Sequence, residues 1–224
     1  MSARISVIVP AKNEAGSIGP VLDGVLRYAD EVILVDGHST DRTVELAREK
    51  GITVVRDSGR GKGAGLRRGI DEATGDILVF IDGDGSHEPA DIPNLAAPIV
   101  AGDADLVIGS RLLGGSEELH GNLSNYLRMV GAGFITLIIN LRWKQELTDV
   151  ENGFRAVSAT VARKLDLRAD DFDIEQEMVM NALRRGCRVR EVPSHEFKRS
   201  AGCSKLPTWK GFKFLWRLFL GLFR

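Results

Sequence analysis

The 224-residue sequence predicts an α/β domain built on a mainly parallel sheet. Short, nearly continuous apolar runs alternate with amphipathic stretches over the first hundred residues. The runs are rich in β-branched residues, as buried parallel strands are, and the stretches between them have helical spacing. Alternating strands and helices imply right-handed crossovers, which bring successive strands into one sheet side by side.

The first half therefore contains five expected strands joined by helices. The strands are expected over 5–11, 31–37, 52–57, 76–84 and 104–110, and three of the helices over 17–29, 39–51 and 63–75. After Arg111 the alternation loosens. We expect one or two helices over 123–143, then a loop, a strand and a helix over 147–167, a helix over 172–187, and strand character over 188–199, where Pro193 suits a sheet edge.

Composition indicates a globular protein of the reducing cytoplasm. Hydrophobic residues make up 43 % of the chain, and 30 basic residues nearly balance 31 acidic ones, which gives no reason to expect a nucleic acid partner. Cys187 and Cys203 lack the spacing of a zinc site, and no secretory signal precedes the first strand.

The C-terminal segment differs in charge from the rest of the chain, because residues 197–224 hold seven basic residues and no acidic ones. Residues 209–224 combine aromatic and leucine side chains with a basic stripe that includes Arg217. A helix of this length is about 24 Å long, too short to cross a bilayer. We expect it to lie on an anionic membrane surface; the alternative is a helix docked on the protein core or on a dimer partner.

Polar and glycine-rich segments follow the expected strands at the sheet edge where α/β proteins bind ligands. The glycines of "SGRGKGAG" (58–65) have backbone amides that suit phosphate, but their spacing fits neither a P-loop nor a dinucleotide fingerprint. Asp82 and Asp84 stand at the end of the fourth expected strand, in "IDGDGSHEP". Two carboxylates at this edge suit Mg²⁺ or Mn²⁺, whose remaining coordination positions would be filled by phosphate and water. An ordinary turn without a metal also uses aspartate.

These segments in order carry a resemblance to a known family. "VIVPAKNEAGSI", "ILVDGHSTDRT", "DILVFIDGDGSHEPADI", "VIGSR", "NGFRAV" and "EVPSHEFKRSAGCSK" resemble the inverting GT-A glycosyltransferases, and among them the dolichyl-phosphate mannose synthases and related polyprenyl-phosphate sugar synthases. The resemblance implies a GT-A domain over 1–206, with a nucleotide-sugar half (1–111) and an acceptor half (112–206), followed by a membrane-interface tail (207–224).

The resemblance also implies roles for individual residues. Those implied for the nucleotide-sugar donor are Pro10, Lys12, Glu14, Val35, Asp36, Lys62, Asp82, Gly83, Asp84, Arg199 and Lys205. Those implied for the metal are Asp82, Asp84 and Ser86, and those for the acceptor are Arg111, Arg128, Arg155 and Ser204, with Asp149 near the reacting centre. Asp36 also suits a turn or helix cap, and Arg155 a structural ion pair. Asn125 and Met129 stand where relatives often carry an Arg and a Ser that hold the lipid phosphate.

The expected activity is metal-dependent transfer of a hexose, with inversion, from GDP-mannose or a UDP-sugar to a polyprenyl or dolichyl phosphate on the cytosolic membrane face. An anionic phosphate needs no strong base, whereas a hydroxyl acceptor would need a carboxylate within reach. Asp149, Glu151, Glu175 and Glu177 are the candidates for that case, and His87, in a loop, suits a capping group better than a base or a metal ligand. A third possibility is a non-catalytic module that binds a nucleotide sugar or lipid.

Overall fold

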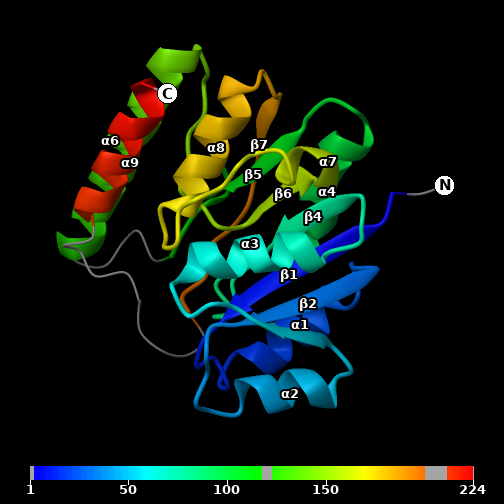
Figure 1. Ribbon diagram of the computed structural model, residues 1–224. Coiled ribbons are helices and arrows are strands. Elements are labelled where there is room, and N and C mark those ends of the chain that lie inside the picture. The colour runs from blue at the N-terminus through cyan, green and yellow to red at the C-terminus, as the bar shows by residue number, and fades with distance from the viewer. Residues whose placement is uncertain (1–2, 118–122, 200–210, 224) are drawn as a thin grey trace.

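The computed structural model describes residues 3–117, 123–199 and 211–223, and only the backbone at 123–128, 211–213 and 223. Within these ranges a seven-stranded sheet with the order β3-β2-β1-β4-β6-β5-β7 forms the centre of the molecule (Figure 1). The strands are β1 (Ile5–Ala11), β2 (Glu31–Asp36), β3 (Thr53–Arg56), β4 (Ile77–Phe80), β5 (Leu106–Ser110), β6 (Arg155–Ser158) and β7 (Val189–Pro193).

The sheet is mainly parallel, as expected, with one reversed strand. β1 pairs in parallel with β2 and β4, β2 with β3, and β5 with β7. β6 lies antiparallel between β4 and β5. β7 forms the expected sheet edge and ends at Pro193. β4 ends at Phe80, four residues earlier than predicted, so that Asp82 and Asp84 lie in the loop that follows it.

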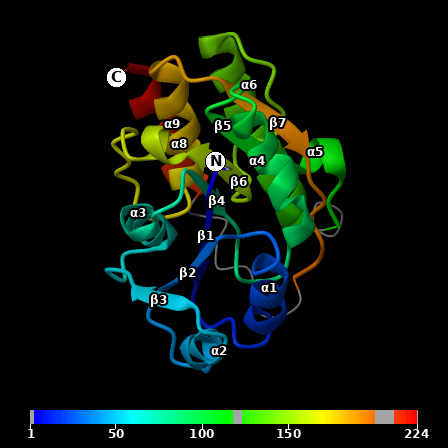
Figure 2. The same ribbon diagram turned by 90° about the vertical axis from the view of Figure 1, so that its right-hand side faces the viewer.

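Helices cover both faces of the sheet (Figure 2). They are α1 (Ile18–Val25), α2 (Thr43–Glu49), α3 (Lys62–Glu72), the 3₁₀ turn η1 (Pro89–Asp91), α4 (Ile92–Val100), α5 (Arg111–Gly114), α6 (Leu123–Trp143), α7 (Ala159–Ala162), α8 (Ile174–Arg184) and α9 (Gly211–Phe223). Buried side chains of α1, α2 and α4 pack on one face, and those of α3, α6, α7, α8 and α9 on the other. The burial of both faces explains the apolar run in β1: Ile8 faces the helices α3 and α6 to α9, and Val7 and Val9 face α1, α2 and α4.

The C-terminal helix α9 docks on the body of the protein, beside α6 and α8 (Figure 1). Leu218 of α9 is buried. A Cβ at Gly221 of α9 would lie 2.5 Å from the sulfur of Met180 of α8, so α8 and α9 are in close contact. Arg217 donates to Asp173 and Glu177 of the α8 region, both at 2.8 Å. The expectation that Arg217 belongs to a lipid-facing basic stripe is therefore wrong, because its charge is neutralised against the protein.

The outward sides of α6 and α9 are apolar. On α6, Val130, Phe134, Leu137 and Leu141 are each at least half exposed, and on α9 so are Trp216 and Phe219, with Leu215 somewhat less. Among the residues the structure describes, no helix combines the length and apolar character needed to cross a bilayer. The pair of helices thus presents one exposed apolar face, defined here by the four α6 residues and Leu215, Trp216 and Phe219.

Candidate active site

A cavity of about 610 Å³ opens at the carboxyl ends of β1, β2 and β4. Its polar wall comes from the segments that follow these strands, from the glycine-rich start of α3, and from the loop that precedes β6. Another part of its wall is apolar and comes from α6 and α9, including Met129, Ile135, Phe214 and Leu215. The cavity therefore has both a charged and an apolar lining.

Asp82 lies in the polar wall and is held by a lysine from α3. Lys62 Nζ is 2.7 Å from Asp82 Oδ1 and 2.8 Å from Glu175 Oε1, so one ammonium group serves two carboxylates. Burial opposes both charged forms, but the Lys62–Asp82 attraction outweighs it, lowering the pKa of Asp82 and raising that of Lys62. A Cβ at Gly153 would lie 2.7 Å from Lys62 Nζ, so only glycine allows this approach.

Asp84 is buried at 7 % exposure and points in a fixed direction. Its Oδ1 accepts from the backbone N–H of Ser86 at 3.1 Å and from the Ser86 hydroxyl at 2.7 Å. Its Oδ2 is 3.3 Å from Nε of Arg199. Both carboxylates of the Asp82-Gly83-Asp84 segment thus have a cation of the same chain beside them, and Ser86 orients Asp84.

The donor set at this loop suits a hard cation that is only partly bound by protein. In the described part of the chain no group of three or more His, Cys, Asp or Glu side chains could hold a metal ion. Asp82 and Asp84 supply two carboxylates, and a cation there would need phosphate or water to complete its shell. The residues present therefore fit Mg²⁺ or Mn²⁺ bound together with a phosphorylated ligand.

Of the residues expected near the nucleoside, the cavity wall includes Pro10, Lys12, Glu14 and Val35 but not Asp36. Asp36 is 1 % exposed; its Oδ1 accepts from the N–H of Ser39 at 2.9 Å, and its Oδ2 faces Arg56 Nε at 3.4 Å. It holds the turn after β2 together, which is the alternative that its position also suggested.

Asp57, one residue after β3, lines the cavity instead, although the sequence analysis did not single it out. Its Oδ1 accepts from the N–H of Gly59 at 2.6 Å. Its position in the sequence could have indicated this role, because Asp57 stands at the same sheet edge, directly before the glycine-rich segment.

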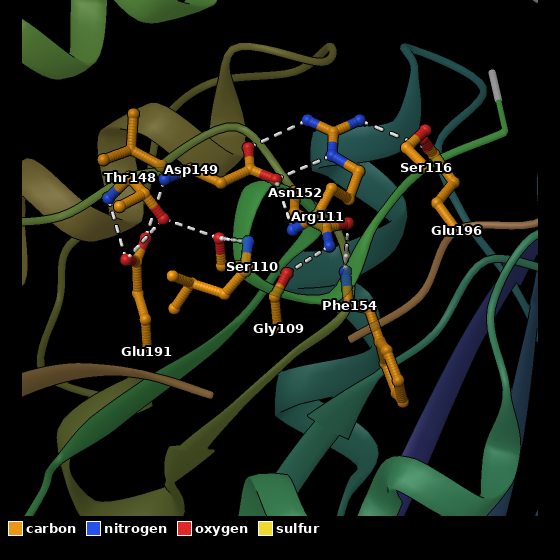
Figure 3. Close-up of polar contacts among 12 residues, drawn as sticks. Gly109, Ser110, Arg111, Ser116, Thr148, Asp149, Asn152, Phe154, Glu191 and Glu196 are labelled. Carbon is orange, nitrogen blue, oxygen red and sulfur yellow. Dashed lines mark hydrogen bonds and ion pairs between the residues drawn. The ribbon is translucent and has the colours of Figure 1, made fainter. Parts of the chain in front are cut away.

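Arg111 forms a closed ionic cluster with Asp149 and Glu196 (Figure 3). Its Nε and Nη2 donate to the two oxygens of Asp149 at 2.7 and 2.9 Å, and its Nη1 donates to Glu196 at 3.2 Å. Burial would raise the pKa of Asp149, but the Arg111 hydrogen bonds lower it. Asp149 is thus an ionised residue that is poorly suited to removing a proton, and its backbone N–H is anchored to Glu191 at 2.7 Å.

Arg155 lies outside the cavity wall, contrary to the role that the resemblance implied. It is 1 % exposed, and its guanidinium donates to the backbone carbonyls of Val150, Asn152 and Glu175. Satisfying buried carbonyls in this way fixes the loop before β6 against α8. Its role in the structure is therefore to position the loop.

Three residues of the predicted site, Ser204, Lys205 and the side chain of Arg128, lie outside the described residues. Apart from Asp36 and Arg155, the structure brings the other predicted residues to one cavity: Pro10, Lys12, Glu14, Val35, Lys62, Asp82, Gly83, Asp84, Ser86, Arg111, Asp149 and Arg199 all line it. It also adds Glu151, Glu175 and His87 to the wall. Burial lowers the pKa of His87, which stacks on Phe154 at 5.1 Å between ring centres.

Comparisons with known proteins agree with this architecture. The model of Glycosyl transferase family 2 matches residues 6–166. An uncharacterized protein of Methanocaldococcus jannaschii is 31 % identical, over 97 % of this chain and 91 % of its own. The undecaprenyl-phosphate mannosyltransferase of Micrococcus luteus is 32 % identical, over 91 % of this chain and 87 % of its own.

A solved structure supports the fold. The glucosyl-3-phosphoglycerate synthase of Mycobacterium tuberculosis, crystallised with Mn²⁺, UDP and phosphoglyceric acid, superposes with a TM-score of 0.77 at 24 % identity, over 98 % of this chain and 78 % of its own. At this identity the match bears on the fold, which is GT-A. Taken with a family match across most of the chain, the mainly parallel sheet and its charged edge place this protein in glycosyl transferase family 2, as a glycosyltransferase.

Proposed function

We propose that this glycosyltransferase moves a hexose from a nucleotide diphosphate sugar to a polyprenyl phosphate, with inversion at the anomeric carbon. The observation that carries the proposal is a cavity lined both by Asp82 and Asp84 and by apolar side chains of α6 and α9. A polyprenyl phosphate has an anionic head and a long apolar chain, so its two parts match the two kinds of lining. The Micrococcus luteus relative, an undecaprenyl-phosphate mannosyltransferase by name, supports this acceptor class.

A divalent cation, Mg²⁺ or Mn²⁺, bound by Asp82 and Asp84 belongs to the proposal. When bound, it would offset the negative charge that develops on the leaving diphosphate. Lys62 keeps Asp82 ionised for this role, and Ser86 keeps Asp84 in one orientation. Arg199, beside Asp84, is the described cation best placed to meet a diphosphate bound there. Lys205, which follows it outside the described residues, is proposed to act with it.

Pro10, Lys12, Glu14 and Val35 form the wall proposed for the nucleoside. GDP-mannose and UDP-sugars are the donor candidates. On the acceptor side a phosphate oxygen attacks the anomeric carbon in line as the bond to the donor diphosphate breaks. No proton has to be removed, because the attacking oxygen is already ionised. This suits a site in which Asp149 is ionised and fully bound to Arg111.

Transfer can be tested with the whole chain, Mn²⁺, labelled GDP-mannose or UDP-sugars and a short polyprenyl phosphate. Label that partitions into organic solvent supports the proposal. Label found only in soluble product would instead support a hydroxyl acceptor, and nucleotide binding without turnover would support a binding module.

The metal assignment is tested by Asp84→Asn, with Asp103→Asn as the matched control on an exposed loop. Asp84→Asn should lower metal-dependent turnover by at least about a hundredfold while the thermal midpoint changes little, because a charged ligand is lost. The control should behave as wild type. Full turnover by Asp84→Asn would refute the assignment.

We also propose that the exposed apolar face of α6 and α9 rests on the cytosolic face of a membrane. Leu215 belongs both to this face and to the cavity wall, so a lipid chain could pass from the bilayer into the cavity without crossing water. An apolar patch on a pair of helices suits interfacial binding.

Flotation with anionic liposomes tests this surface. Phe134→Gln combined with Trp216→Gln should reduce the bound fraction, whereas Val100→Gln, on an α4 residue that is 62 % exposed on the other side of the sheet, should not. The proposal that this face binds the membrane would be contradicted if both variants lost binding equally, or if neither lost any.

A further inference from the structure

Glu151 is an unpartnered acid in the cavity wall. It lies in the loop before β6, and its buried Oε1 has no hydrogen-bond partner among the described residues. The two acids whose charges act on it differ, because each forms an ion pair. Asp149 is bound by Arg111, and Lys62 Nζ lies 2.8 Å from Glu175 Oε1.

The groups that face Glu151 come from several elements, and none neutralises it. Glu175 of α8 and Asp149 of its own loop are negative. Arg155 of β6 and Arg111 of α5 are positive, but the first donates to backbone carbonyls and the second to Asp149 and Glu196. Burial, followed by repulsion from Glu175, raises the pKa of Glu151 to about 8. Glu151 is accordingly protonated at pH 7.

A protonated carboxyl in this wall can do what an ionised one cannot. It donates a hydrogen bond, and it adds no negative charge to a cavity that already holds Asp82, Asp84 and Asp149. Both properties favour an anionic ligand. A phosphate oxygen is a strong acceptor for such a donor, and the bond is charge-assisted.

We propose that Glu151 is a positioning residue that donates a hydrogen bond to the phosphate of the acceptor and, on losing its proton, repels that phosphate. This inference rests on the proposed function, since it requires an anionic acceptor. The Arg111 guanidinium cannot supply all the hydrogen bonds that the acceptor phosphate needs, because its donors are already bound to Asp149 and Glu196. The neutral carboxyl of Glu151 supplies a further donor.

The test measures KM for a short polyprenyl phosphate between pH 6.5 and 9.5 at saturating nucleotide sugar. Wild-type KM should rise above pH 8, approaching tenfold per pH unit, because only the protonated form binds well. Glu151→Gln, which stays neutral and keeps a donor, should remove this rise, so that at pH 9 it binds the acceptor more tightly than wild type. Glu151→Met, of similar volume without a donor, should raise KM roughly ten- to a hundredfold at pH 7.

Two results would overturn the role of Glu151 while leaving the proposed function intact: a KM rise in Glu151→Gln equal to that of wild type, or loss of kcat in Glu151→Gln at every pH. The second would make Glu151 a base. Failure of the wild type to form lipid-linked product would instead overturn the proposed function.

Infrared difference spectra of wild type against Glu151→Gln need no substrate. They should show a protonated carboxyl band at pH 7 that disappears above pH 8. An ionised carboxylate at pH 7 would overturn the inference by itself.

Discussion

Glu151→Gln should stabilise the folded protein, and increasingly so as the pH rises from 4.5 to about 8. In the folded state the pKa of Glu151 is about 8, against 4.5 for an unhindered glutamate. Between these values the folded protein keeps a proton that the unfolded chain releases. Stability linked to this group is therefore complete below pH 4.5 and is lost as the pH rises through the folded-state pKa, whereas glutamine has no such loss.

The size of the effect follows from the same two values. At pH 7, which is 7 − 4.5 = 2.5 pH units above the ordinary pKa, the linkage corresponds to about 3 kcal/mol at most. For a chain of this length that is a rise of roughly 6–12 °C in thermal midpoint. At pH 4 the two proteins should unfold alike.

Urea unfolding at pH 4, 5, 6, 7 and 8 measures the difference directly. Glu45→Gln, on a side chain that is 62 % exposed in α2, is the matched control and should show no such trend. A difference between Glu151→Gln and wild type that does not grow with pH would refute the reasoning, as would lower stability of the variant at pH 7.

Three further outcomes are expected. Arg217→Met should lower the free energy of unfolding by about 3 kcal/mol, because two buried carboxylates of the α8 region lose their cation; an unchanged urea midpoint would show that α9 does not depend on this contact. Gly114→Ala should destabilise strongly, since its Cβ would overlap the backbone of Ser194, whereas Gly19→Ala, in open space on α1, should be neutral or slightly stabilising by urea titration. Asp149→Asn should flatten the acid limb of the stability curve: the lowered pKa of Asp149 contributes stability above its ordinary value of 3.8 that is lost as the pH falls, and an acid limb identical to wild type would contradict this.

The sheet and its charged edge could be predicted because the signals are local. Apolar runs of six to nine residues predicted β1 to β5, and the two aspartates after Phe80 were recognisable from their place at the end of such a run. The direction of β6 was not recognisable. It pairs with β4, nearly eighty residues earlier, and an isolated apolar segment carries no information on which neighbour it joins.

The roles of individual acids were also beyond the sequence, because they depend on which cation each one meets. Asp36 ends β2 and Asp57 follows β3, yet the first holds a turn and the second lines the cavity. Asp149 and Glu151 are two residues apart, yet the pKa of the first is lowered by Arg111 and that of the second raised by burial. Arg217 likewise needed the position of α8 before its partners could be known.

The reversal of β6 has a consequence for how this enzyme can vary. Because β6 runs against β4 and β5, the loop that leads into it arrives at the same edge as the loops that leave its neighbours. The wall that contains Asp149 and Glu151 is thus carried by a separate chain segment, tied to the sheet through Arg155 and Glu191. Substitutions in this segment can alter one side of the cavity while the pairing of β1, β2 and β4 keeps the other side unchanged, so the two halves of the reaction can diverge independently.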